Sequence, residues 1–390
     1  MTKNPLAGLN RLPIIALDGP SALVLYRDRD DAELITTPPT YTSDAAVDLP
    51  YLSDEDIAAT LASTNVFGHR AFDPLVDGSG ESTDTPTLRR ARVKSLASCA
   101  SCSADFKRTP YAALGLRPPT SDSPLYVLVP NDLARRKVHN VRQRAFSSRM
   151  PADSLKWLGN SVLVPSPELT LLLLARHLDV VDLATACMEV CGRYRLVGAT
   201  SNDLFRSNRT LYDQGQLSTP RRLLNLCDRA DGMWGRALVR RACKYFAPNS
   251  SSPMETVVYL LLCLPRSLGG YGLPKPLLNA KRRVTADAGM ITLSQTLIPD
   301  LYWPGARLDM EYDSDEFHSD LESLQKGARR TMALRAMNVD VLSVTYDLVN
   351  DERAFDVMAR MVAKRLNVRL PSGKADKRER RLELRKRLLA

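Results

Sequence analysis

The sequence of residues 299–318, PDLYWPGARLDMEYDSDEFH, constrains the fold of this chain more than any other stretch. Over residues 308–313 apolar and acidic side chains alternate, and a period of two is that of a β-strand with two different faces. The acidic residues Asp309, Glu311 and Asp313 therefore share one face of this strand. Carboxylates that lie so close repel one another, so the surrounding structure has to tolerate or neutralise them.

A Pro-Gly pair precedes this strand, and turn-forming residues there predict that residues 293–302 pair with it as a hairpin. A loop of residues 305–306 places Asp300 opposite Glu311, whereas a loop that starts one residue earlier places it opposite Asp309. Either register brings carboxylates within about 4.5–8 Å across the strands. A cation, a proton or a basic side chain is then needed between them. In the alternative interpretation, the acids line the open, solvated face of an antiparallel hairpin.

The composition favours a polyanionic partner. The net charge of +10 suits DNA as a partner, although a solvated basic surface explains the same charge. The 390 residues suffice for two or more domains. The seven cysteines are scattered and odd in number, and no signal peptide is recognised, so we expect reduced thiols in a cytoplasmic protein. No apolar run approaches the roughly 20 residues that a membrane-spanning helix needs. A homodimer is compatible with the sequence.

Four regions are expected along the chain. Residues 1–110 form an unassigned N-terminal α+β segment, in which the apolar runs on either side of residues 18–20 are predicted to be two strands. Residues 111–250 form a second α+β module for binding DNA or a partner. The predicted helix at residues 234–246 carries cations spaced by about one turn, a stripe that suits a phosphate backbone or a solvated face. These cations are Arg236, Arg240 and Lys244.

Residues 251–370 are expected to form a mixed sheet flanked by helices, in the order α-β-β-β-α-β-α, so that the overall class is α/β (α+β over the whole chain). The predicted helices span residues 255–264, 320–337 and 349–366, and the predicted strands span residues 277–287, 290–302, 307–313 and 339–346. The tail, residues 371–390, is strongly basic. It is expected to be a short helix or a free arm that contacts nucleic acid or solvent.

These elements, with Pro299-Asp300 before Glu311-Tyr-Asp313, resemble the PD-(D/E)xK nuclease superfamily. They are most similar to a branch whose C-terminal domain is similar to the very-short-patch repair endonuclease. In that branch the sequence reads approximately D-L-x-W-P-x-x-R-L-x-x-E-Y-D-G-x-x-H. An arginine-rich helix and a strand that reads V-x-x-V-T follow this motif. The resemblance covers about residues 253–366 and rests on Asp300, Leu301, Trp303, Pro304, Arg307, Leu308, Glu311, Tyr312, Asp313, His318, Arg329, Arg330 and residues 341–345. Residues 112–245 are similar, more loosely, to the AbiEi-type antitoxin domain that often precedes such a domain.

The resemblance implies a restriction-endonuclease-like fold with a metal-dependent catalytic site. Asp300 and Glu311 would hold Mg²⁺ or Mn²⁺, which prefer carboxylate oxygens, and Glu255 would reach the same site from its helix. Asp313 stands where many members have a lysine, and His318 would act as a general base or contact phosphate. Basic residues of the following helix would contact the phosphate in place of that lysine, namely Lys326, Arg329 and Arg330.

Two functions from different classes are consistent with these residues. The first is a metal-dependent DNA endonuclease, a Mg²⁺-dependent endodeoxyribonuclease acting in repair or defence, and the intact Asp300 and Glu311 pair favours it. The second is a non-catalytic DNA-binding regulator of the antitoxin type with a degenerate nuclease fold. The missing lysine and the additional acids Asp315 and Glu316 favour this second function. Converging Asp300 and Glu311 carboxylates would support the first, and splayed ones the second.

Overall fold

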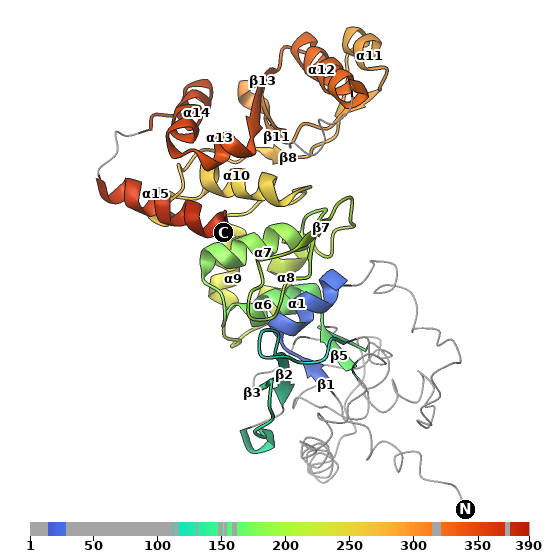
Figure 1. Ribbon diagram of the computed structural model, residues 1–390, viewed down its shortest axis with the longest axis vertical. Coiled ribbons are helices and arrows are strands. Elements are labelled where there is room, and N and C mark those ends of the chain that lie inside the picture. Colours follow the sequence, from blue (N-terminus) through green and yellow to red (C-terminus); the bar gives the residue numbers. More distant parts are fainter. Residues whose placement is uncertain are drawn as a thin grey trace, which may run out of the picture. The chain divides into compact units, whose positions relative to one another are not determined.

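The computed structural model describes residues 15–28, 111, 116–129, 132–146, 151, 154–157, 162–313, 321–370 and 375–389 (Figure 1). The chain divides into two compact units, each built from several stretches of sequence. Unit 1 comprises Met1–Asp179, Leu196–Arg209 and Arg221–Arg240, and unit 2 comprises Val180–Arg195, Thr210–Pro220 and Arg241–Ala390. Most of the expected N-terminal segment, residues 1–110, lies outside the described residues.

Unit 1 is organised around a five-stranded mixed sheet in the order β3-β2-β1-β5-β4. Its strands are β1 (Ile15–Leu17), β2 (Leu125–Val129), β3 (Val141–Ala145), β4 (Leu155–Trp157) and β5 (Val162–Pro165). The central strand β1 is antiparallel to β2 and parallel to β5. The helical elements of this unit are α1 (Gly19–Asp28), η3 (Asp132–Ala134), α6 (Pro167–Leu174) and α8 (Pro220–Arg229).

Helix α1 replaces the second of the two strands expected near the N-terminus. The side chain of Asp18 accepts a hydrogen bond from the Gly19 amide at 2.7 Å, and Pro20 occupies the first turn, where proline is tolerated. Gly19 suits this position because α1 packs closely on α6, and a Cβ there would lie 2.8 Å from the Leu174 nitrogen. The strand prediction for residues 21–26 is wrong because a short apolar run fits a buried helix as well as a buried strand.

Unit 2 contains a four-stranded mixed sheet in the order β13-β12-β11-β8. Its strands are β8 (Leu277–Leu278), β11 (Leu301–Trp303), β12 (Leu308–Asp313) and β13 (Asp340–Thr345). Strand β11 is antiparallel to both neighbours, whereas β12 and β13 are parallel and are connected through α12 (Leu321–Ala336). A small antiparallel pair, β9 (Arg282–Arg283) and β10 (Thr296–Leu297), flanks α11 (Ala286–Thr292) between β8 and β11 in the sequence.

Helices α11 and α12 pack on one face of this sheet. Tyr302 and Val341 from the strands, Ala288 of α11, and Ala333 and Leu334 of α12 belong to one apolar cluster. The other helical elements of unit 2 are α7 (Val180–Val190), α10 (Pro253–Cys263), η4 (Arg266–Leu268), η5 (Pro304–Ala306), α13 (Tyr346–Asn350), α14 (Glu352–Arg365) and α15 (Ala375–Leu388). The elements β6 (Arg195–Val197), β7 (Arg209–Leu211) and α9 (Arg236–Cys243) each contain a point at which the chain passes between units, and α8 contains another after Pro220. Within the described ranges, no helix combines the length and apolar character that crossing a membrane requires.

The predicted mixed α/β class is confirmed, but the strands expected over residues 277–287 and 290–302 are much shorter than predicted. The side chain of Thr285 accepts a hydrogen bond from the Ala288 amide at 3.4 Å and begins α11. Leu293, in the left-handed conformation with φ 57°, ends the helix. A capped helix therefore interrupts the stretch that apolar residues alone had suggested to be extended.

The described part of the basic tail is a docked helix, not a free arm. Helix α15 packs against α10 and η4. Within it, Arg385 is buried, donates to the Val349 carbonyl and lies over the Phe355 ring at 5.1 Å from its centroid. Ion pairs join further arginines of the helix to unit 2: Arg378 to Glu352, Arg381 to Asp356 and Arg387 to Asp182. These cations therefore serve the packing of unit 2.

Candidate functional site

The hairpin of β11 and β12 adopts the register that places Asp300 beside Glu311. Tyr302 pairs with Asp309. Two residues further along each strand, on the same face, Asp300 lies opposite Glu311. The connecting loop spans residues 304–307 and contains a turn of 3-10 helix, so it is longer than the predicted two residues. The first of the two predicted registers is nevertheless confirmed.

Helix α12 covers the acidic face of β12. The Asp309 side chain is fully buried, and Glu311 retains 9% of its exposed surface. Ala333 and Leu334 of α12 pack on the sheet, and Arg330 lies one turn earlier on the same side of the helix. The alternative of an open, solvated acidic face is therefore wrong for Asp309 and Glu311.

The Arg330 guanidinium lies between the two predicted metal-binding carboxylates. Its Nη2 atom is 2.7 Å from Glu311 Oε2 and 3.3 Å from Asp300 Oδ1, and it also donates to the Ile298 carbonyl. Burial disfavours the charged guanidinium, but Glu311, Asp300 and Asp309 outweigh burial and raise the pKa of Arg330. One arginine therefore joins the two carboxylates that the resemblance had assigned to a metal ion.

Glu255 approaches Asp300 from helix α10 through Asn279. Ser252 caps this helix by accepting a hydrogen bond from the Glu255 amide at 3.1 Å. One oxygen of Glu255, Oε2, accepts hydrogen bonds from the Ser251 amide at 2.9 Å and from Asn279 Nδ2 at 2.6 Å. The backbone amide of Asn279 in turn donates to the backbone carbonyl of Asp300 at 3.1 Å. Asn279 has no role in the sequence prediction, because a lone asparagine after a short strand gives no signal of its partners.

Asp309 is the other residue whose role the sequence prediction missed. Both oxygens of its carboxylate are buried, and among the described residues neither accepts a well-aligned hydrogen bond, although the Met310 amide lies near enough to lower the pKa of the group. The neighbouring carboxyl of Glu311 interacts with it and forms a hydrogen bond only if the two share a proton. We refer to Glu255, Asp300, Asp309 and Glu311 as the acid cluster.

Burial is the largest cause of the raised pKa of every carboxyl group in the acid cluster. It raises the pKa of Asp309 to about 6, of Glu255 and of Asp300 to about 7, and of Glu311 to about 9. Neighbouring carboxylates add to this effect, since Asp300 acts on Glu255, Glu311 acts on Asp300, and Asp309 acts on Glu311. Near neutral pH the acid cluster therefore holds protons or needs more positive charge than Arg330 supplies.

The other predicted site residues of unit 2 differ in position. Asp313 lies half-buried at the end of β12 on the acidic face, and Lys326 and Arg329 lie on exposed parts of α12. Lys244, just after α9, is also exposed. His318 lies outside the described residues. The structure therefore brings Glu255, Asp300, Glu311 and Arg330 together from the predicted set.

The predicted basic stripe on α9 is largely neutralised within unit 1. Arg236 forms an ion pair with Asp231, and Arg240 forms one with Asp228. Each arginine therefore has an acidic partner that would compete with phosphate. This arrangement weakens the prediction that the two residues contact DNA.

The acid cluster suits a divalent cation in chemistry, but not in its present arrangement. Among the described residues, no three His, Cys, Asp or Glu side chains are arranged to hold a metal ion. Carboxylate oxygens are the ligands that Mg²⁺ and Mn²⁺ prefer, and no described residue places a well-aligned donor at the oxygens of Asp309. The carboxylate oxygens of the acid cluster therefore fit such an ion. The Arg330 guanidinium lies between Asp300 and Glu311, at the position where the two carboxylates would share the ion.

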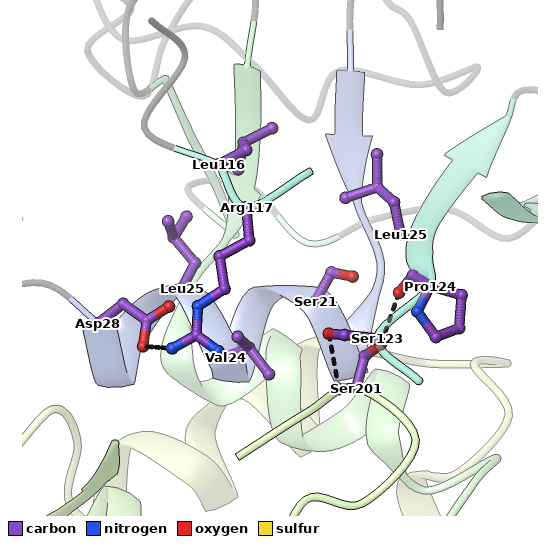
Figure 2. A pocket seen from close by; sticks show the side chains of 10 residues that line it. All are labelled: Ser21, Val24, Leu25, Asp28, Leu116, Arg117, Ser123, Pro124, Leu125 and Ser201. Atoms are coloured by element: carbon purple, nitrogen blue, oxygen red, sulfur yellow. Dashed lines mark hydrogen bonds and ion pairs between the residues drawn. The ribbon is translucent and has the colours of Figure 1, made fainter. Parts of the chain in front are cut away.

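A separate cleft lies in unit 1 and is shown in Figure 2. Its charged lining residues, Asp28 and Arg117, form an ion pair with each other. At its other end the Ser201 hydroxyl donates to the Pro124 carbonyl at 2.5 Å, and Ser123 lies beside it. These contacts tie loops together, so the cleft offers less chemistry than the acid cluster.

No family model, no curated protein and no solved structure matches this chain. Its function therefore has to be inferred from the geometry of the site and from the sequence pattern.

Proposed function

We propose that unit 2 is a metal-dependent DNA endonuclease module of the PD-(D/E)xK type, acting by phosphodiester hydrolysis. The observation that carries this proposal is the convergence of the Asp300 and Glu311 carboxylates on one guanidinium, with the buried carboxyl of Glu255 on α10 near enough to Asp300 for the two charges to interact. Buried acids without matching donors destabilise a fold, so their presence needs a functional reason. Binding of a divalent cation supplies such a reason.

In this proposal Asp300 and Glu311 hold Mg²⁺ or Mn²⁺, with Glu255 close behind them. When bound, the ion would polarise the scissile phosphate and lower the pKa of a water molecule. Glu255, with its pKa raised to about 7, is suited to exchange a proton near neutral pH. Lys326 and Arg329 are exposed on α12 and would contact the phosphate backbone.

The order of elements also supports a restriction-endonuclease-like fold. Without the inserted β9, α11 and β10, unit 2 runs α10, β8, β11, β12, α12, β13, which is the expected α-β-β-β-α-β order. The sheet is mixed, and its β12–β13 pair is parallel. The PD and E-x-D residues of the sequence motif lie together at the end of the β11–β12 hairpin.

The second candidate is a DNA-binding regulator of the antitoxin type with a degenerate nuclease fold. Arg330 favours it, because an arginine that already forms ion pairs with Asp300 and Glu311 stabilises a site that no longer binds metal. In this case the loose similarity of residues 112–245 to AbiEi-type antitoxins would describe the active part of the chain.

Plasmid nicking distinguishes the two functions. We expect the wild type with Mn²⁺ or Mg²⁺ to nick supercoiled DNA, and Asp300→Asn and Glu311→Gln to lose at least 100-fold in rate. Asp287→Asn, at an exposed acid in the first turn of α11, is the matched control and should retain the rate. Equal nicking by all four proteins would refute the nuclease assignment. DNA binding without nicking by any of them would favour the regulator.

A further inference from the structure

The burial of Asp309 requires an explanation beyond the proposed ligand pair. Its carboxylate is fully buried, lies beside Tyr302 on β11 and Val341 on β13, and accepts no well-aligned hydrogen bond from the residues that the structure describes. A buried carboxylate without a donor is costly, and proteins usually pair such a group, protonate it or bind a metal with it. Asp309 and Glu311 lie two residues apart on β12 and therefore point to the same side of the strand.

Arg330 satisfies the neighbouring carboxylates only in part. All its hydrogen bonds to Ile298, Asp300 and Glu311 leave from one nitrogen, Nη2. Its Nε is buried and has no acceptor. An arginine that is built into a carboxylate site usually uses two nitrogens of its planar fork. Arg330 therefore supplies positive charge here without the full geometry of a permanent partner.

The surroundings of Arg330 allow it to leave. Its side chain retains 35% of its exposed surface. Gly327 lies three residues earlier, on the same side of α12, and no atom of the described residues lies within 4 Å of the position that a Cβ would take there. Long helical side chains lean toward the N-terminus of their helix, which is the direction of this open space. Gly327 costs helix stability, and room for the arginine is a reason to retain it.

We propose that the acid cluster binds its divalent cation in exchange for the Arg330 guanidinium, with Asp309 as a third carboxylate ligand beside Asp300 and Glu311. The inference rests on the proposed function in one respect, that this site takes a divalent cation. It goes further by assigning Asp309 as a ligand and by making ion binding and the inward position of Arg330 mutually exclusive. The ion brings two positive charges where the guanidinium brings one, so it neutralises the acid cluster more completely than Arg330 does.

Mn²⁺ binding followed by titration calorimetry tests this exchange in the full-length protein. We expect Arg330→Gln to bind Mn²⁺ at least tenfold more tightly than the wild type, because the ion no longer displaces a cation. Asp309→Asn should bind at least tenfold more weakly in both the wild-type and the Arg330→Gln backgrounds. The matched controls are Arg335→Gln, at an exposed arginine of α12, and Asp287→Asn, and both should stay within twofold of the wild type.

The outcomes separate this inference from the proposed function. Mn²⁺ binding that Glu311→Gln abolishes, but that Arg330→Gln and Asp309→Asn leave unchanged, would overturn the exchange while the metal site stands. Absence of Mn²⁺ binding in both the wild type and folded Arg330→Gln would overturn the metal site and the exchange together. If Arg330→Gln does not fold without metal, Arg330→Lys, which keeps the charge without the fork, replaces it and should bind Mn²⁺ more tightly than the wild type.

Discussion

Replacing Asp309 by asparagine should stabilise the protein in the absence of metal. Burial raises the pKa of this carboxyl from 3.8 to about 6. Each pKa unit corresponds to about 1.4 kcal/mol, so ionised Asp309 destabilises the fold by up to about 3 kcal/mol. Asparagine has nearly the same shape, cannot ionise, and adds an amide group that can donate to the Glu311 carboxylate. Little hydrogen bonding to Asp309 is lost in the exchange, because its oxygens have no well-aligned donor within the described part of the chain.

The direction of the Asp309 pKa shift determines how the stability gain of Asp309→Asn depends on pH. Since the pKa of Asp309 is higher in the folded state, the folded protein holds the proton longer, and stability falls as pH rises from about 4 to about 6. Above that range the full destabilisation is present. We therefore expect Asp309→Asn to gain about 1–3 kcal/mol at pH 8 and about half of that gain at pH 5.

Urea unfolding followed through Trp303 measures this gain at the site itself. The chain has 3 tryptophans, and a background with Trp157→Phe and Trp234→Phe leaves Trp303 as the reporter. This residue is 3% exposed and donates to the Pro274 carbonyl at 2.7 Å. Asp287→Asn, at an exposed position, should change stability by less than about 0.5 kcal/mol. A loss of stability in Asp309→Asn at pH 8, or a gain independent of pH, would refute the reasoning.

Three further predictions concern the same unit. The metal-free wild type should lose stability as pH rises from about 5 to 9, because burial raises the pKa of Asp300 to about 7 and of Glu311 to about 9; saturating Mn²⁺ should flatten this dependence in thermal unfolding. Ser252→Ala should destabilise α10 by about 1 kcal/mol in urea unfolding through loss of its cap. Arg385→Met should destabilise unit 2 by about 2 kcal/mol or more, whereas Lys386→Met, at an exposed position, should change stability little.

The strand pairing around the acidic stretch could be predicted from sequence because it depends on local rules. Alternation defines the face of β12, and the turn residues limit the hairpin to two registers, one of which is observed. The pairing of Asp300 with Glu311 follows directly from that register. The same rules do not show whether the acidic face is open or covered, because a helix more than ten residues away in sequence decides this. For this reason the burial of Asp309 was not predicted.

The incorrect element predictions also have local physical causes. Residues 21–26 and 286–292 are short runs in which helix and strand patterns cannot be separated by periodicity. In both cases a side chain just before the run accepts a hydrogen bond from an amide at the start of the helix, Asp18 from Gly19 and Thr285 from Ala288, and this contact favours the helix. The bridging contact of Arg330 depends on the docking of α12 on the sheet, and sequence gives the charge of that residue without its direction.

The path of the chain between the two units limits how this protein can change in evolution. The chain passes from one unit to the other at five points, after Asp179, Arg195, Arg209, Pro220 and Arg240. A single recombination event within the chain cannot transfer unit 2 with all its segments, because two of them are embedded in the sequence of unit 1. The acid cluster is therefore inherited together with unit 1. Unit 2 cannot be exchanged between proteins as one continuous segment. An amino-acid substitution in either unit is therefore inherited and selected together with the other unit.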